Sequence, residues 1–95
     1  MKVVWCPEAS QDIDTLFHAL RRRNDWAGSR LLRVIQMTIA NLMSKPATGR
    51  PMDDGSGRRE IFLRFGAGAY VIRYKVVDPT SLAIIRVSHV PEIPD

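Results

Sequence analysis

The stretch Tyr70-Val71-Ile72-Arg73-Tyr74 decides the fold of this chain, because its side chains alternate in character with a period of two. Such alternation is typical of a β-strand that buries one face. Residues 59–64 (REIFLR) and 84–89 (IIRVSH) repeat the pattern on either side. The connections, residues 66–68 and 77–81, are short enough for hairpins. We therefore expect a three-stranded antiparallel meander that carries an arginine in every strand.

The alternation also predicts which side chains share a face of this sheet. The set expected to face inward consists of Ile61, Leu63, Phe65, Tyr70, Ile72, Tyr74, Val76, Ala83, Ile85 and Val87. The set expected to face outward consists of Glu60, Phe62, Arg64, Val71, Arg73, Lys75, Ile84 and Arg86. Like charges side by side repel, so the outward cations favour an anionic partner. A solvated face, partly neutralised by Glu60 and Glu92, is the alternative interpretation.

A short strand and two amphipathic helices precede the meander. Residues 2–5 form a β-prone run, and Pro7 suits the first turn of a helix. One face of this first helix carries Ala9, Ile13, Leu16, Phe17 and Leu20. A second helix is expected from about residue 26 to Ser44, with an apolar stripe of Leu32, Ile35, Ile39, Leu42 and Met43. Residues 46–58 are rich in Pro, Gly, Asp and Ser, and predict a loop.

The predicted fold class is α+β, with an αα-hairpin packed on a small, mainly antiparallel sheet in the order β-α-α-β-β-β. Residues 1–95 are expected to form one domain. The expected core comprises Ile13, Leu16, Leu20, Ile35, Ile39, Tyr70, Ile72, Tyr74, Ile85 and Val87.

The charge of the chain is positive and mostly guanidinium. The net charge is +4, and of the fourteen basic residues only Lys2, Lys45 and Lys75 are lysines. Guanidinium groups suit bidentate contacts with carboxylates and phosphates, so an acidic protein and a nucleic acid are both compatible partners. Cys6 is the only cysteine, which excludes an intrachain disulfide and favours a reducing, cytoplasmic compartment. No stretch approaches the roughly 20 apolar residues of a membrane span.

The sequence lacks the spacing of a metal or phosphate site. Cys6, His18 and His89 stand too far apart to form a ligand motif, and residues 49–57 lack the Gly-Lys-Ser/Thr of a P-loop. We therefore expect no cofactor and no metal. His89 has two interpretations: a general acid or base, because its pKa lies near neutrality, or a residue that packs at the end of the last strand. We favour the second.

Several short motifs occur together along the chain. They are Trp5, Glu8-Ala9 and Asp12-Ile13 at the first helix, Leu42, Pro46 and Gly49-Arg50-Pro51 after the second, and Arg59-Glu60, residues 70–74 and residues 85–89 in the strands. In these motifs and in its order of elements, the whole chain resembles the RelE/ParE superfamily of bacterial toxins. RelE-like members cut mRNA on the ribosome, whereas ParE-like members poison DNA gyrase through protein contact and have no known catalytic residues.

The resemblance favours the ParE-like branch. Glu60, Phe62 and Val71 stand where RelE-like enzymes tend to carry basic residues. This branch implies no catalytic residues, a gyrase-directed toxin with a role in plasmid stabilisation, and a cognate antitoxin that forms a hetero-oligomer with it. The expected partner-binding residues are Arg58, Arg59, Arg64, Arg73, Lys75 and Arg86.

Two alternatives stay open at this point. The first is a RelE-like mRNA endonuclease that acts on the ribosome with Arg64, Arg73, Arg86 and His89 as its catalytic residues. The second is an inactive relative that serves its antitoxin as a DNA-binding corepressor. The resemblance implies no membrane partner in either case.

Overall fold

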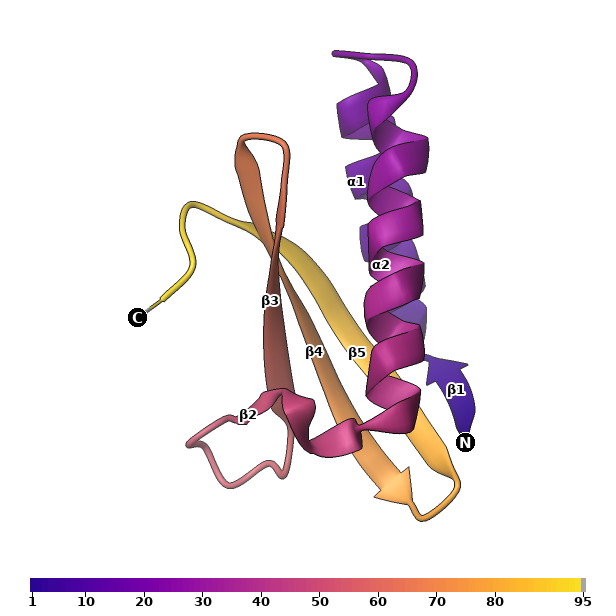
Figure 1. Ribbon diagram of the computed structural model, residues 1–95, viewed down its shortest axis with the longest axis vertical. Helices are drawn as coiled ribbons and strands as arrows, with labels where there is room; N and C mark the ends of the chain where they lie inside the picture. The colour runs from indigo at the N-terminus through magenta and orange to yellow at the C-terminus, as the bar shows by residue number, and fades with distance from the viewer. Residues whose placement is uncertain (95) are drawn as a thin grey trace.

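Two helices lie against one face of a twisted β-sheet in residues 1–94, the part of the chain that the computed structural model describes (Figure 1). The helices are α1 (Pro7–Arg21) and α2 (Ala27–Ser44), followed by a short 3-10 turn, η1 (Pro46–Thr48). The strands are β1 (Lys2–Trp5), β2 (Arg50–Pro51), β3 (Arg59–Phe65), β4 (Gly68–Asp78) and β5 (Ser81–Val90). They are ordered β1-β5-β4-β3-β2 across the sheet. The predicted α+β class and the order β-α-α-β-β-β are confirmed.

The meander is antiparallel throughout, and β1 joins it in parallel with β5. The pair β4–β5 forms the centre of the sheet, since β1 and β3 flank it on its two sides. Strand β2 was not expected, because residues 46–58 were predicted to be only a loop. Its two residues pair with Arg59 and Glu60 at the start of β3.

The helix boundaries follow from local chemistry. Pro7 occupies the start of α1, where its fixed φ is already helical and its missing N–H costs nothing. Glu8 in the first turn and Arg21 in the last complement the helix dipole. Gly28 allows α1 and α2 to approach closely, because a Cβ atom there would lie 2.7 Å from Cδ2 of Phe17.

The core lies between the helix stripes and the inward face of the sheet. Its buried members are Ala9, Leu31, Ile35, Ile39, Leu42, Leu63, Tyr70, Ile72, Tyr74, Leu82, Ile84 and Val87. Ile13, Leu16 and Leu20 of α1, all expected in the core, are partly buried and pack against it. The predicted apolar stripe of α2 was partly wrong. Leu31, which was not expected in it, is buried, whereas the expected Leu32 is half-buried and the expected Met43 is exposed.

A β-bulge in β5 overturns part of the predicted parity. Arg73 pairs with Arg86, but its neighbour Tyr74 pairs with Ile84. Ile85 is therefore an extra residue that has no cross-strand partner on β4. Beyond the bulge Val87 faces inward as predicted. Before it, the parity is reversed: Ile84 is fully buried in the core, and Ile85 is only half-buried outside it.

Val76 was also expected to face inward and is instead 39% exposed. It lies toward the end of the β4–β5 hairpin, which projects past the end of the helices (Figure 1). Its cross-strand partner Leu82 is fully buried, so burial of the inward face stops within this pair of residues.

The buried Tyr74 ties the segment after α2 to the sheet. Its hydroxyl donates to the carbonyl of Pro46 (2.7 Å) and accepts from the N–H of Gly49 (2.8 Å). Burial raises the pKa of Tyr74, so the hydroxyl keeps its proton. Arg59 adds a bond from Nη1 to the carbonyl of Gly49 (2.7 Å). Only glycine fits at position 49, because a Cβ atom would lie 2.5 Å from the Tyr74 hydroxyl oxygen.

We expect Tyr74→Phe to lower the free energy of unfolding by about 2 kcal/mol, because the buried N–H of Gly49 and the partly buried carbonyl of Pro46 lose their partner. Urea denaturation at neutral pH measures this change. Tyr70→Phe is the matched control, since Tyr70 is similarly buried but borders an open hollow. Equal losses in the two variants would contradict an anchoring role for the Tyr74 hydroxyl.

Candidate functional site

The outer face of the sheet, opposite the helices, carries a row of charged residues. Glu60 pairs with Arg73 across β3 and β4, and Arg73 pairs with Arg86 across β4 and β5. The predicted grouping of Arg73 and Arg86 on this face therefore agrees with the register. Two arginines opposite each other repel. A carboxylate at each end of the row offsets this repulsion.

Glu60 holds the end of the row on β3. Its Oε1 lies 3.0 Å from Nε of Arg50, and its Oε2 lies 3.4 Å from Nε of Arg73. The Glu60 side chain is only 12% exposed, so the two cations compensate a largely buried charge. Arg50 also covers the ring of Phe62, with its guanidinium carbon 5.1 Å from the ring centroid.

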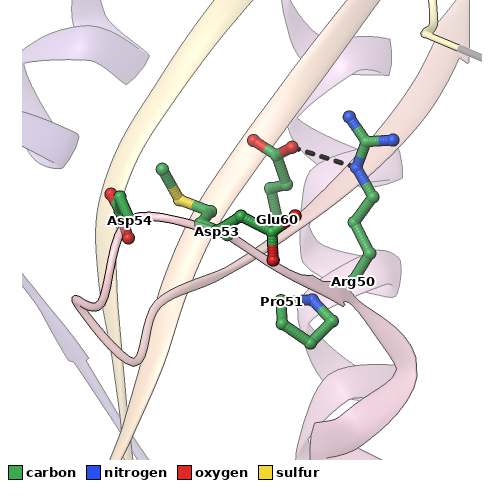
Figure 2. Close-up of a pocket in the computed structure, with 6 residues that line it drawn as sticks. Arg50, Pro51, Asp53, Asp54 and Glu60 are labelled. Carbon is green, nitrogen blue, oxygen red and sulfur yellow. Dashed lines mark hydrogen bonds and ion pairs between the residues drawn. The ribbon is translucent and has the colours of Figure 1, made fainter.

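A hollow of about 420 Å³ lies beside the Arg50–Glu60 pair, next to Asp53 and Asp54 (Figure 2). Acidic and basic groups are mixed here. Hydrogen bonds from Ser56 hold the pKa of Asp54 below its usual value. Within residues 1–94 no three His, Cys, Asp or Glu side chains come together in a way that would hold a metal ion.

Asp12 of α1 holds the other end of the row. Its Oδ2 accepts from Nε of Arg86 (2.8 Å) and from the backbone N–H of Val87 (2.9 Å), and its Oδ1 accepts from Nη2 of Arg86 (3.0 Å). The Arg86 guanidinium, with a smaller contribution from the Val87 N–H, lowers the pKa of Asp12 despite partial burial. The same contact raises the pKa of Arg86. We call this contact the Asp12 clamp.

The remaining predicted partner-binding residues are placed differently. Arg59 pairs with Tyr74, so its register is that of the inner face, where it bonds to Gly49. Arg64 is exposed near the far end of β3. Lys75 and Arg58 line a hollow of about 480 Å³ that Cys6, Ile85 and Arg86 also border. Neither Arg58, Arg64 nor Lys75 forms an ion pair with another residue of the described chain.

His89 lies on the opposite face of the sheet from Arg73 and Arg86. It pairs with the core residue Tyr70, and the two rings meet edge to face with their centroids 5.2 Å apart. Burial raises the pKa of Tyr70, and the charge of Arg23 partly offsets this effect. The structure therefore brings Arg73 and Arg86 together and sets His89 apart from them.

Sequence reasoning missed the roles of Asp12 and Arg50. Asp12 looked like any residue on the polar side of α1, and Arg50 lay in a segment interpreted as loop. The family motifs contained both residues, Asp12-Ile13 and Gly49-Arg50-Pro51, which was the one available signal. No described helix is long and apolar enough to cross a membrane.

Comparison with known proteins gives a consistent result. A sequence family described as the ParE toxin of the type II toxin–antitoxin system parDE matches residues 3–94. Toxin RelE1 of Caulobacter vibrioides is 33% identical over 81 residues, which are 85% of this chain and 84% of that protein.

Two solved structures share the fold. The chromosomal ParDE toxin–antitoxin system from P. aeruginosa superposes with a TM-score of 0.63 at 18% identity, over 95% of this chain and 96% of that one. The toxin–antitoxin complex RelBE2 from Mycobacterium tuberculosis superposes with a TM-score of 0.64 at 23% identity, over 94% and 96%.

The Asp12 clamp predicts a pH-dependent stability. Because the folded pKa of Asp12 lies below the unfolded value of 3.8, its contribution is complete above that value and is lost as the pH falls through the folded pKa. We expect Asp12→Asn to cost about 1 kcal/mol at neutral pH, a modest value because Arg86 is half exposed.

Urea denaturation at about pH 7 and about pH 3 tests this expectation, with Asp14→Asn on the exposed side of α1 as control. The difference between wild type and Asp12→Asn should shrink in acid. A difference that stays the same at both pH values, or that Asp14→Asn reproduces, would contradict the clamp.

Proposed function

Since this chain belongs to the ParE toxin family of type II toxin–antitoxin systems, we propose that it inhibits DNA gyrase by protein contact. A cognate antitoxin neutralises it by forming a hetero-oligomer with it. Residues 1–95 act as one toxin domain in the cytoplasm, and no cofactor takes part.

The observation that carries this proposal is that two arginines of the sheet, Arg73 and Arg86, are paired with carboxylates of this chain. Arg73 is paired with Glu60, and Arg86 with Asp12, so both guanidinium groups already have carboxylate partners. His89, which has the ordinary chemistry of a general acid or base, lies on the other face. A ribonuclease needs an acid–base group within reach of the cations that hold the phosphate. This arrangement favours a toxin that works by contact.

The second candidate is a ribosome-dependent mRNA endonuclease. It is favoured by the 33% identity to a protein named Toxin RelE1. Its catalytic residues would be Arg64, Arg73, Arg86 and His89. It requires the Asp12 and Glu60 pairs to open on the ribosome, since these carboxylates would otherwise compete with the RNA phosphates for the arginines.

The proposed partner-binding residues are the cations expected from the sequence: Arg58, Arg59, Arg64, Arg73, Lys75 and Arg86. Of these, Arg64, Lys75 and Arg58 supply charge that is not neutralised by a salt bridge within residues 1–94. An acidic antitoxin segment that folds on the toxin would gain most from these three. Arg59, Arg73 and Arg86 already bond to other residues of the described chain, so we expect a smaller contribution to partner binding from these three.

We expect the purified toxin to inhibit supercoiling of relaxed plasmid DNA by gyrase, and to leave ribosome-bound mRNA uncut. Gel analysis of plasmid topoisomers and primer extension on the mRNA measure the two activities. Antitoxin added in excess is the control and should restore supercoiling. Codon-specific mRNA cleavage that Arg73→Ala or His89→Ala abolishes would instead establish the endonuclease.

We expect Arg64→Glu/Lys75→Glu to weaken antitoxin binding by about 2 kcal/mol or more if these cations meet carboxylates in a desolvated contact. Isothermal titration calorimetry at moderate salt measures the change. Arg30→Glu/Arg33→Glu on the exposed side of α2 makes the same change of charge elsewhere, and serves as control. Equal affinities for the two double variants would remove the outer face of the sheet from the antitoxin interface.

A further inference from the structure

The net positive charge of the chain is concentrated where α1 passes into α2. Residues 21–33 contain five arginines and one carboxylate, so they carry a net charge of +4, which equals that of the whole chain. The other nine basic residues are matched by nine acidic ones. The connection between the helices lies at one end of the molecule, and the N-terminus lies near the other (Figure 1). We call residues 21–33 the hairpin tip.

The charge of the hairpin tip is exposed and not neutralised by the rest of the chain. The side chains concerned are Arg21, Arg22, Arg23, Asp25, Arg30 and Arg33, and all of them are exposed. No ion pair among residues 1–94 includes any of these six. Like charges on neighbouring helical positions repel, so an anionic ligand that lies across the tip would relieve this repulsion.

An exposed indole lies within this charge. Trp26 is 70% exposed, the largest fraction among the large apolar side chains of residues 1–94. Arg30 and Arg33 follow it at four and seven positions, so the three side chains share one face of α2. Asn24 fixes the backbone here, because its Oδ1 accepts from the N–H of Trp26 (2.9 Å) and its carbonyl accepts from the N–H of Ala27 (3.1 Å). The indole therefore stands on an ordered turn.

We infer that the hairpin tip binds single-stranded nucleic acid, with one base stacked on Trp26 and backbone phosphates at Arg30 and Arg33. An exposed aromatic ring beside a positively charged track holds single strands, because every base has a π-face and guanidinium groups pair well with phosphates. A duplex keeps its bases inside the stack and would leave the indole without a partner. This function goes beyond gyrase inhibition and does not depend on it.

Two other ligands fit the hairpin tip less well. A helix that lies on an anionic membrane buries a broad apolar face in the lipid. Here the apolar stripe of α2 packs in the core, and Trp26 is the one exposed apolar side chain of residues 21–33. An acidic protein segment would pair with the arginines, but its carboxylates would not stack on the indole.

Fluorescence anisotropy of labelled oligo(dT) and oligo(U), each of about 12 nucleotides, tests this inference on the purified toxin. We expect a Kd of about 10 µM at about 50 mM salt, and about twentyfold weaker binding at about 200 mM salt if about three phosphates are contacted. Trp26→Ala should weaken binding about tenfold through the loss of stacking. Arg30→Gln/Arg33→Gln should lower the slope of log K against log salt by about 1.4.

The matched control is Lys2→Gln/Lys45→Gln, which removes two exposed cations at β1 and directly after α2, toward the other end of the molecule (Figure 1). It should change the Kd by less than about twofold. Trp5→Phe gives a second readout, because Trp26 is then the only tryptophan. Its fluorescence should be quenched as either oligonucleotide is added.

Binding of either oligonucleotide with these variant effects supports the inference, and the tighter of the two shows whether DNA or RNA is the ligand. No binding at about 50 mM salt, or an equal loss in the lysine control, would overturn it. Displacement by oligoglutamate as strong as by unlabelled oligonucleotide would also overturn it, and would indicate an acidic protein partner. A loss of binding in Arg73→Gln/Arg86→Gln but not in the tip variants would place the ligand on the outer face of the sheet instead.

Discussion

The edge of β5 beyond Ile84 sets the main constraint on this structure. β1 covers the first half of that edge and ends at Trp5, opposite Ile84. Past that point the N–H of Val87 would have no strand partner, and an unpaired backbone group near a core is costly. Asp12 supplies the missing acceptor and binds Arg86 with the same carboxylate. One side chain therefore fixes α1 to the sheet, completes the hydrogen bonding of β5 and neutralises an arginine.

Asp12 and Glu60 together divide the cations of the toxin into two groups. Arg50, Arg73 and Arg86 have carboxylate partners and shape the outer face. Arg64 and Lys75 on the sheet, and Arg22 and Arg23 at the end of α1, have none within the described chain. The two carboxylates thereby offset the repulsion between Arg73 and Arg86, which lie opposite each other on the sheet.

The sequence predicted the order of elements and most of the core because period-two and helical spacing report directly on burial. It failed where a single residue changes the period. The consecutive apolar residues Ile84 and Ile85 are compatible with either parity, and only the pairing with β4 shows that Ile85 is the bulged one. The site was harder to predict, because the contact between Asp12 and Arg86 joins residues 74 positions apart. No local pattern encodes such a contact.

The claim that Arg86 is a structural partner of Asp12 is tested most directly by a double-mutant cycle with Asp12→Asn and Arg86→Gln. Urea denaturation at neutral pH gives the free energy of unfolding of the wild type, both single variants and the double variant. If the clamp holds, the second substitution costs little once the first is present, so the two effects are strongly non-additive. Fully additive effects would contradict the account and leave Arg86 free for another role.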